Sequence, residues 1–434
     1  MAQSLKVAEA PATEAQSRAP DIFYSFSILL LLSTGAMIAF VDRTSISSVL
    51  AYKPFIHQFA LSAVGRGWIS SAFFWSYAVI QMPMGWIVDR YGVKTPYTIC
   101  FAIWCIATAA TGLVSALVGV VLIRLFIGVS ESIVMPASYR WMRDNFDEKL
   151  NGTAVGIFSL GNKLGPAIGA PVASWLIVNS SWRLMFILTG VVGILWLLPW
   201  MFFVKNDLPK GAEIAAIRRR ASSVSFSNIM RSPVVWGAMI SSFCHAYFTF
   251  YCMTWMPSYL VEQRGLSLEQ SGLYTFFSFA GIAFVSVIAG GAADALIARG
   301  WNAVPVRKAF VLAGYVGAST VVLGAQAESL NMALFWNVCS LSFLGLETAN
   351  NLALCRLTLI PKPAVGLVTG VQQVASSLAG GIAASLSGWL LHISGSYYLP
   401  MQVIFVFMLI GAVSTWILLR PEWAPKAVVE NPAV

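Results

Sequence analysis

The sequence contains twelve apolar runs, each long enough to cross a lipid bilayer as a helix. Hydrophobic residues make up 58% of the 434 residues and charged residues only 10%, compared with roughly 25% charged residues in an average soluble domain. A helix needs about 20 apolar residues to cross a hydrocarbon core about 30 Å thick. We therefore predict an all-α integral membrane protein of about twelve transmembrane helices, with spans near residues 24–49, 68–88, 96–114, 117–140, 153–178, 182–204, 234–260, 271–297, 308–327, 331–357, 365–392 and 398–419.

Basic residues are concentrated in the loops on one side of the predicted membrane. The even-numbered loops hold 16 Lys and Arg residues, whereas the odd-numbered loops hold four. Because loops rich in Lys and Arg stay in the cytosol, this asymmetry predicts that both termini are cytosolic. The net charge of +9 therefore reflects orientation in the membrane and does not indicate binding to nucleic acid.

The longest hydrophilic stretch divides the predicted spans into two groups of six. It covers 205–233 and includes Arg218, Arg219 and Arg220. We expect this segment to be a cytosolic linker between two bundles at 24–204 and 234–420, with cytosolic tails at 1–23 and 421–434.

A short motif recurs after the second and the eighth predicted span. The first copy contains Gly85, Asp89, Arg90, Gly92 and Lys94, and the second contains Asp294, which lies 205 residues after the first Asp. Matching positions in two halves are typical of internally repeated transporters. The Gly permits close helix contact, the Asp can cap a neighbouring helix, and the basic residues can meet lipid phosphates.

Six ionisable side chains lie within the predicted spans. Each costs about 2.5–3.5 kcal/mol on insertion scales, so each is a candidate functional residue. They are Asp42, Arg43, Arg124, Glu131, Lys163 and Glu347.

The first four of these charges are expected to form one cluster. Arg124 and Glu131 are separated by about two helical turns and share a helix face, and Asp42 lies at a depth similar to that of Arg124. A carboxyl group beside a movable Arg can alternately hold and release a proton, and the Arg fork binds a carboxylate in bidentate fashion. The cluster predicts proton coupling with anion capture, while permanent salt bridges that fix helix register are the alternative. Asp42 and Arg43 point about 100° apart, so the sequence leaves open whether both reach one cavity.

Other polar side chains in the spans are candidates for substrate binding or for contacts between helices. Lys163 is either a second contact for an anion or a counter-charge for Glu347, and Glu347 either binds substrate hydroxyl groups or packs between helices. Gln373 and Ser377 lie on a polar face that is expected to line a cavity.

The seventh span carries His245, Tyr247, Tyr251 and Trp255 at helical spacing. This pattern is more typical of packing than of recognition. We expect two of these four side chains to face the cavity, and Tyr251 is one candidate.

The motif from Gly85 to Lys94 resembles the loop signature of the major facilitator superfamily. Within that superfamily, residues Phe40 to Ser47 resemble the first-helix signature of the anion:cation symporter family, which includes sugar-acid and hexuronate permeases. The resemblance implies two pseudo-symmetric six-helix bundles and proton-coupled uptake of a small organic anion by alternating access. It favours a hexuronate, aldonate or aldarate as the substrate, in a bacterial inner membrane.

By the same resemblance, the functional residues of galactonate-type symporters can be carried over. Asp42 and Glu131 would be proton sites, Arg43 would hold the substrate carboxylate, and Arg124 would tune Glu131. Tyr77 and Asn162 resemble substrate-site residues. The resemblance implies a monomer in the lipid bilayer that uses the proton gradient and has neither a cofactor nor a metal ion.

Two observations keep other transport functions open. The glycines of the fifth span and the Arg124 to Gly128 spacing resemble motifs of proton-coupled drug exporters, although Glu131 and the Asp42-Arg43 pair do not fit them. The aromatic seventh span would also suit an aromatic carboxylate. A membrane sensor would normally need an appended signalling domain, and no arrangement of nucleophile, base and orienting residue suggests an enzyme.

Overall fold

The computed structural model describes residues 22–206, 226–360 and 365–425, and within these ranges every regular element is a helix. All twelve predicted spans are helical. The first six are α1 (Ile22–Leu50), α3 (Ala63–Tyr91), α4 (Lys94–Thr111), α5 (Leu117–Glu131) with α6 (Val134–Asn145), α7 (Glu148–Asn179) and α8 (Trp182–Phe203). The second six are α11 (Pro233–Ser258) with the π-helix η1 (Tyr259–Gln263), α12 (Leu268–Ala298), α13 (Ala303–Ala318) with α14 (Val321–Gln326), α15 (Leu330–Ala353) with the π-helix η2 (Leu354–Leu359), α16 (Val365–Ser394) and α17 (Tyr398–Leu418).

Three short helices lie outside the spans: α2 (Lys53–Gln58), α10 (Phe226–Met230) and η4 (Pro421–Trp423). Most of the predicted linker, including Arg218, Arg219 and Arg220, lies outside the described residues, as do most of both tails. The bundle boundaries therefore stay a prediction.

The outer surface of the helix array is apolar. Eight helical segments of the described chain are long and apolar enough to cross a membrane, and α3, α4, α7 and α11 are more polar helices packed among them. Large side chains such as Phe202 and Phe284 point outward, with 82% and 68% of their surface exposed. Such a surface requires lipid around it, which confirms the membrane-embedded class.

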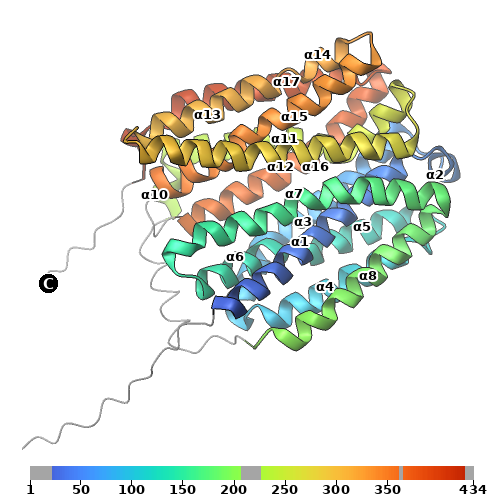
Figure 1. Ribbon diagram of the computed structural model, residues 1–434. Coiled ribbons are helices and arrows are strands. Elements are labelled where there is room, and N and C mark those ends of the chain that lie inside the picture. Colours follow the sequence, from blue (N-terminus) through green and yellow to red (C-terminus); the bar gives the residue numbers. More distant parts are fainter. Residues whose placement is uncertain (1–21, 207–225, 361–364, 426–434) are drawn as a thin grey trace, which may run out of the picture.

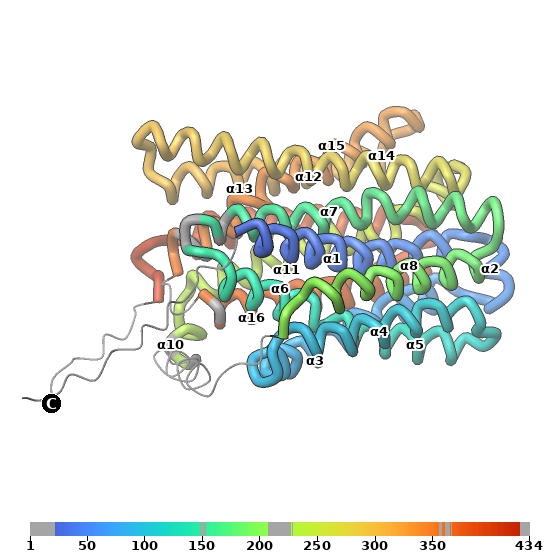
Figure 2. The backbone as a smooth tube through the Cα atoms, turned by 60° about the horizontal axis from the view of Figure 1, so that its bottom comes forward, coloured from blue at the N-terminus to red at the C-terminus, as the bar shows by residue number. Residues whose placement is uncertain are grey.

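The two halves of the chain form two six-helix bundles that lie side by side. In Figure 1 the first half, blue to green, occupies the lower part of the view, and α12 to α15 with α17 occupy the upper part; Figure 2 shows the same separation from another side. The bundles meet along the pairs α3 with α16 and α7 with α12. The predicted architecture is confirmed.

Contact between the bundles is tightest at the end away from the linker. A Cβ atom on Gly67 of α3 would lie 2.9 Å from the carbonyl oxygen of Ala384 in α16, and one on Gly272 of α12 would lie 2.9 Å from Cα of Pro171 in α7. Toward the linker end, a Cβ atom on Gly370 would meet no atom within 4 Å. Only a residue without a side chain permits the backbones to approach so closely at the closed end.

An ion pair joins the bundles at that same end. Arg66 of α3 binds Glu262 of η1 through both terminal nitrogens, and Tyr397 donates a hydrogen bond to Glu262 Oε2 at 2.7 Å. Arg66 Nη1 also donates to the carbonyl oxygen of Leu50 at 3.2 Å. The structure is therefore closed at the end opposite the linker.

Each of the repeated Asp residues interacts with an Arg of another helix, and the predicted capping role stays a prediction. Asp89 of α3 interacts electrostatically with Arg140 of α6. In the second copy, Asp294 Oδ1 accepts a hydrogen bond from Arg307 Nη2 at 2.7 Å.

The other residues of the first motif shape the turn between α3 and α4. Gly92 ends α3 with a φ of +79°, a conformation that favours glycine. The guanidinium of Arg90 lies 5.4 Å from the ring of Trp86, and Lys94 Nζ donates to the carbonyl oxygen of Met201 at 3.0 Å.

Candidate functional site

A buried ion pair links α1 and α5 in the first bundle. Arg43 Nε donates to Glu131 Oε2 at 2.9 Å, and the side chains of Arg43 and Glu131 are 5% and 0% exposed. The two residues are 88 positions apart in the sequence. An ion pair removed from water this fully is strong only while both partners remain charged and in place.

A second carboxyl group lies beside this pair. Asp42 interacts directly with Glu131 and electrostatically with Arg124, and it accepts a hydrogen bond from Thr108 of α4 at 3.1 Å. Asp42 Oδ1 and Glu131 Oε1 have no hydrogen-bond donor among the residues described. The two neighbours Asp42 and Arg43 thus both lie near Glu131, and their access to one cavity stays a prediction.

Arg124 completes the cluster without a direct hydrogen bond to either acid. Its guanidinium is 2% exposed and lies 4.9 Å from the centre of the Phe73 ring. In the described part of the chain, its Nε and Nη1 have no hydrogen-bond partner. It acts on Asp42 and Glu131 through their charge, whereas the direct partner of Glu131 is Arg43.

Three aromatic rings enclose the guanidinium of Arg43. Its central carbon lies 4.4 Å from the centre of the Phe40 ring, 4.8 Å from Phe73 and 4.9 Å from Tyr77. Ring faces attract a cation and exclude water from it, which strengthens its interaction with an anion. Tyr77 was expected at the site. Phe40 and Phe73 were not, although Phe40 precedes Arg43 by three residues on one helix face.

A second group of polar residues lies at α11, α13 and α15. His245 Nδ1 is 2.5 Å from Glu347 Oε2, and Tyr315 lies 3.4 Å from the other carboxylate oxygen. Lys163 of α7 interacts electrostatically with Glu347. The sequence identified Lys163 and Glu347, but it left His245 among four seventh-span residues whose pattern is more typical of packing and of which two were expected to face the cavity.

The remaining predicted site residues include polar atoms without a partner among the described residues and residues that form helix contacts. Asn162 Oδ1 is buried without a donor, and the hydroxyl of Tyr251 has no partner among described residues. Ser377 of α16 donates to Gln81 Oε1 of α3 at 3.1 Å, so it joins the two bundles. Gln373 is half-buried and accepts a hydrogen bond from Ser377 at its backbone oxygen.

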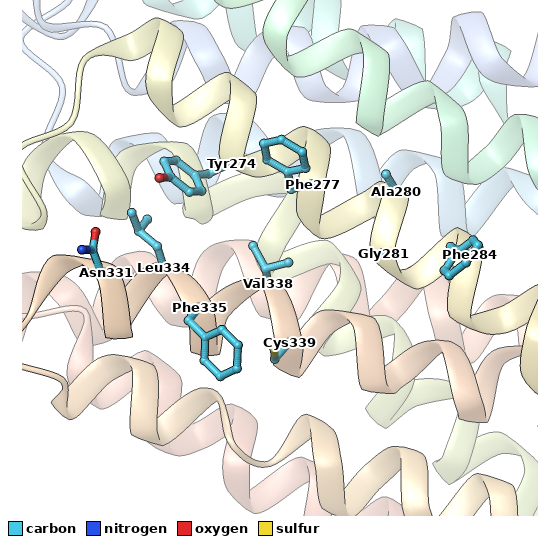
Figure 3. Close-up of a pocket in the computed structure, with 10 residues that line it drawn as sticks. All are labelled: Tyr274, Phe277, Ala280, Gly281, Phe284, Asn331, Leu334, Phe335, Val338 and Cys339. Atoms are coloured by element: carbon cyan, nitrogen blue, oxygen red, sulfur yellow. The ribbon is translucent and has the colours of Figure 1, made fainter.

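One surface hollow of the described chain is separate from these charges. It is a groove of about 620 Å³ between α12 and α15, and Figure 3 shows the side chains that line it. Two of them, Phe284 and Phe335, are 68% and 54% exposed. Its apolar, outward-facing walls are suited to lipid, and none of the six predicted charged residues lines it. The described chain contains no group of three or more His, Cys, Asp or Glu residues that could hold a metal ion.

Two six-helix bundles in a membrane, with charged groups buried inside the array, define the class of secondary transporters. Residues 32–355 match the sequence model described as Major Facilitator Superfamily. The chain belongs to the major facilitator superfamily, as its motifs predicted.

Several characterised transporters are similar over nearly the whole chain. The D-galactonate transporter of Escherichia coli O6:H1 is 29% identical over 408 residues, covering 89% of this chain and 93% of that protein. The hexuronate transporter of Bacillus subtilis (strain 168) is 26% identical, covering 85% of this chain and 89% of its own length. The crystal structure of a D-xylose-proton symporter superposes with a TM-score of 0.74 at 16% identity, over 93% of this chain and all of the other. The fold is thus confirmed, and the chain is a transporter and not an enzyme.

Proposed function

We propose that this protein takes up a small organic anion together with protons, and that the anion is a sugar acid such as a hexuronate, an aldonate or an aldarate. Secondary transport of organic anions follows from the family and its relatives. The observation that carries the finer proposal is the buried Arg43 to Glu131 pair, with a second carboxyl group beside it that has an oxygen without a donor.

The proton is proposed to bind between the two acids of the first bundle. Two carboxylates in contact repel each other when both are ionised, and a proton between them removes this repulsion and gives the pair the donor it lacks. A proton on Glu131 also ends its charge attraction to Arg43. Arg43 is then free to bind the carboxylate of the substrate with its fork of N–H groups.

The charge balance of the cluster links the two events. Asp42 and Glu131 offset Arg43 and Arg124, so the cluster is neutral when all four are ionised. A substrate carboxylate would add one negative charge to a buried site, and a proton on an acid restores neutrality. Because an unbalanced charge in this environment costs several kcal/mol, anion and proton are expected to enter together.

The substrate class is supported by the names of the relatives and by polar groups within the spans. The two similar proteins are named for D-galactonate and hexuronate. Tyr77, Asn162 and Lys163 supply neutral and basic groups for hydroxyl groups and a carboxylate. Glu347, Tyr251, Gln373 and Ser377 are the candidates from the second bundle.

Transport is proposed to occur by rocking of the two bundles about the site. The end closed by Arg66 and Glu262 would be the outer one, because the linker and both termini are expected in the cytosol. Residence in a bacterial inner membrane and function as a monomer belong to the same proposal.

Proteoliposomes containing the purified protein test the direction of coupling. An inward proton gradient is expected to drive accumulation of D-galactonate, D-glucuronate or galactarate inside the vesicles. Benzoate and a lipophilic cation serve as probes for an aromatic carboxylate and for a drug. Substrate that leaves against its gradient as protons enter would establish an exporter and overturn the proposal.

Glu131→Gln tests the proposed proton site. The amide keeps the shape of the side chain but can neither bind nor release the proton. We expect this variant to lose proton-driven accumulation and to keep exchange of labelled for unlabelled substrate. Ser130→Ala is the matched control, because Ser130 Oγ contacts only carbonyl oxygens of its own helix at 2.6 and 3.3 Å. Normal accumulation by Glu131→Gln would remove Glu131 from the coupling role.

A further inference from the structure

The second bundle contains a buried acid whose partner is partly open to its surroundings. Glu347 is 1% exposed, and its Oε2 lies 2.5 Å from Nδ1 of His245, which is 18% exposed. The other nitrogen of His245 lies 3.5 Å from Thr249 Oγ1. A histidine ring can carry a proton on either nitrogen, so in this place it can pass a proton to the buried carboxyl group.

The second carboxylate oxygen of Glu347 lies near the hydroxyl group of Tyr315, which has one hydrogen and more than one possible acceptor. The hydroxyl oxygen of Tyr315 lies 3.4 Å from Glu347 Oε1 and 2.7 Å from the carbonyl oxygen of Ser241. A tyrosine hydroxyl donates only one hydrogen. When Tyr315 donates it to Ser241, the contact with Glu347 becomes a hydrogen bond only if Glu347 itself carries a proton.

The charge opposite this acid comes from the other bundle. Lys163 lies on α7, and it interacts electrostatically with Glu347 on α15. The titratable groups of the described chain that contact Glu347 or interact with it electrostatically include His245 and Cys244 of α11, Tyr315 of α13 and Lys163 of α7. Asp294 of α12 and Arg307 of α13 are bound to each other, and Arg307 also approaches Asn350, one turn beyond Glu347, at 3.4 Å.

We propose that the His245-Glu347 pair is a second proton-binding site, located in the second bundle, and that protonation of Glu347 releases Lys163 to face the transported anion. The proton comes from solvent, reaches His245 and adds to the carboxylate of Glu347, and no other bond changes. This inference rests on the proposed proton-coupled function.

The two sites then follow the same electrostatic rule. In the first bundle, Glu131 holds Arg43 while it is ionised, and in the second, Glu347 attracts Lys163 while it is ionised. Neutralising either acid leaves a base without its counter-charge in a site of low dielectric constant, where it attracts an anion strongly. The consequence is that transport takes up at least one proton beyond those bound by the acids of the first bundle.

The number of protons per substrate is measured from the final accumulation ratio in proteoliposomes at zero membrane potential. The probe is the sugar acid that the wild-type protein accumulates in the uptake experiment. We expect Glu347→Gln and His245→Asn each to lower the number by one. The ratio then falls about tenfold for each pH unit of gradient, since one pH unit is worth about 1.4 kcal/mol.

Ser340→Ala is the matched control for the proton count. Ser340 lies seven residues before Glu347 on the same face of α15, and its hydroxyl bonds only the carbonyl oxygen of Asn337 at 3.1 Å. The control is expected to keep the wild-type proton number. An unchanged number in both Glu347→Gln and His245→Asn would overturn the proposal.

Infrared difference spectra across a pH jump test the site without any transport. Wild-type protein and Ser340→Ala are expected to show the carbonyl band of a buried neutral carboxylic acid that Glu347→Gln lacks. Absence of such a difference would also overturn the proposal. Failure of the proposed function is distinguishable, because it would abolish proton-driven uptake in the wild type and leave this infrared difference in place.

Discussion

Replacing Arg43 separates its two proposed roles, as the partner of Glu131 and as the anchor of the substrate. In the structure its guanidinium is 5% exposed, lies 2.9 Å from Glu131 and is surrounded by three aromatic rings. Arg43→Ala therefore removes a buried charge-assisted contact. Truncating one partner of such a contact costs about 2–5 kcal/mol of binding, which is roughly 30- to 5,000-fold in affinity.

The same change leaves the Glu131 carboxylate buried and unpaired. Breaking a buried ion pair from one side costs about 3–5 kcal/mol of stability. The loss should be largest at high pH, where Glu131 is ionised, and should shrink at low pH, where a proton on Glu131 removes the unpaired charge. The double variant Arg43→Ala with Glu131→Gln should regain most of this stability, because neither buried charge remains.

Two measurements on purified protein check these values. Equilibrium binding of the labelled sugar acid that drives uptake gives the affinity, and thermal unfolding across pH gives the stability. Arg43→Lys keeps the charge and loses the fork, so its affinity should fall between wild type and Arg43→Ala. An affinity of Arg43→Ala within about twofold of wild type, the range of a substitution without a specific role, would refute the assignment of Arg43 as the anchor.

Two further predictions concern the contact between helices. Glu262→Gln should weaken the closed end, since it removes the charge that Arg66 binds between the bundles. Labelling of a cysteine introduced at that end should become faster. An unchanged labelling rate would show that the ion pair does not hold the end closed. Gly128→Ala should lower stability by about 1–3 kcal/mol, because its Cβ would lie 2.3 Å from the carbonyl oxygen of Phe73. Gly156→Ala is the control for thermal unfolding, since its Cβ meets nothing within 4 Å. This control should be neutral or should raise stability by up to about 1 kcal/mol. Equal destabilisation of both variants would contradict the packing explanation.

Much of the architecture could be predicted from the sequence because the membrane restricts the choices. A chain in lipid must satisfy its backbone hydrogen bonds within each span, so apolar runs become helices and their number follows from the pattern. The repeated motif indicated two related halves, and the cost of a buried charge identified Asp42, Arg43, Arg124, Glu131 and Lys163 as residues to explain.

Local geometry was harder to predict. The sequence suggested that Asp89 and Asp294 can cap helices, which stays a prediction, but it did not identify the Arg on another helix that each one interacts with. The spacing of His245 fits a helix face that is more typical of packing, and it did not indicate that the side chain lies against Glu347. Neither sequence pattern shows which residue of another helix will lie opposite.

The sequence by itself determined that acids and bases are buried in the membrane, in which spans they lie and that they require partners. Only the tertiary structure decided which base meets which acid. Arg43 binds Glu131 although Arg124 shares a helix with that acid, and Glu347 meets His245 while Lys163 faces it from the other bundle. The physical reason is that these pairings depend on the rotation of each helix about its axis and on how the helices pack. Those quantities are set by contacts between residues far apart in the chain, such as Arg43 and Glu131, which are separated by 88 positions.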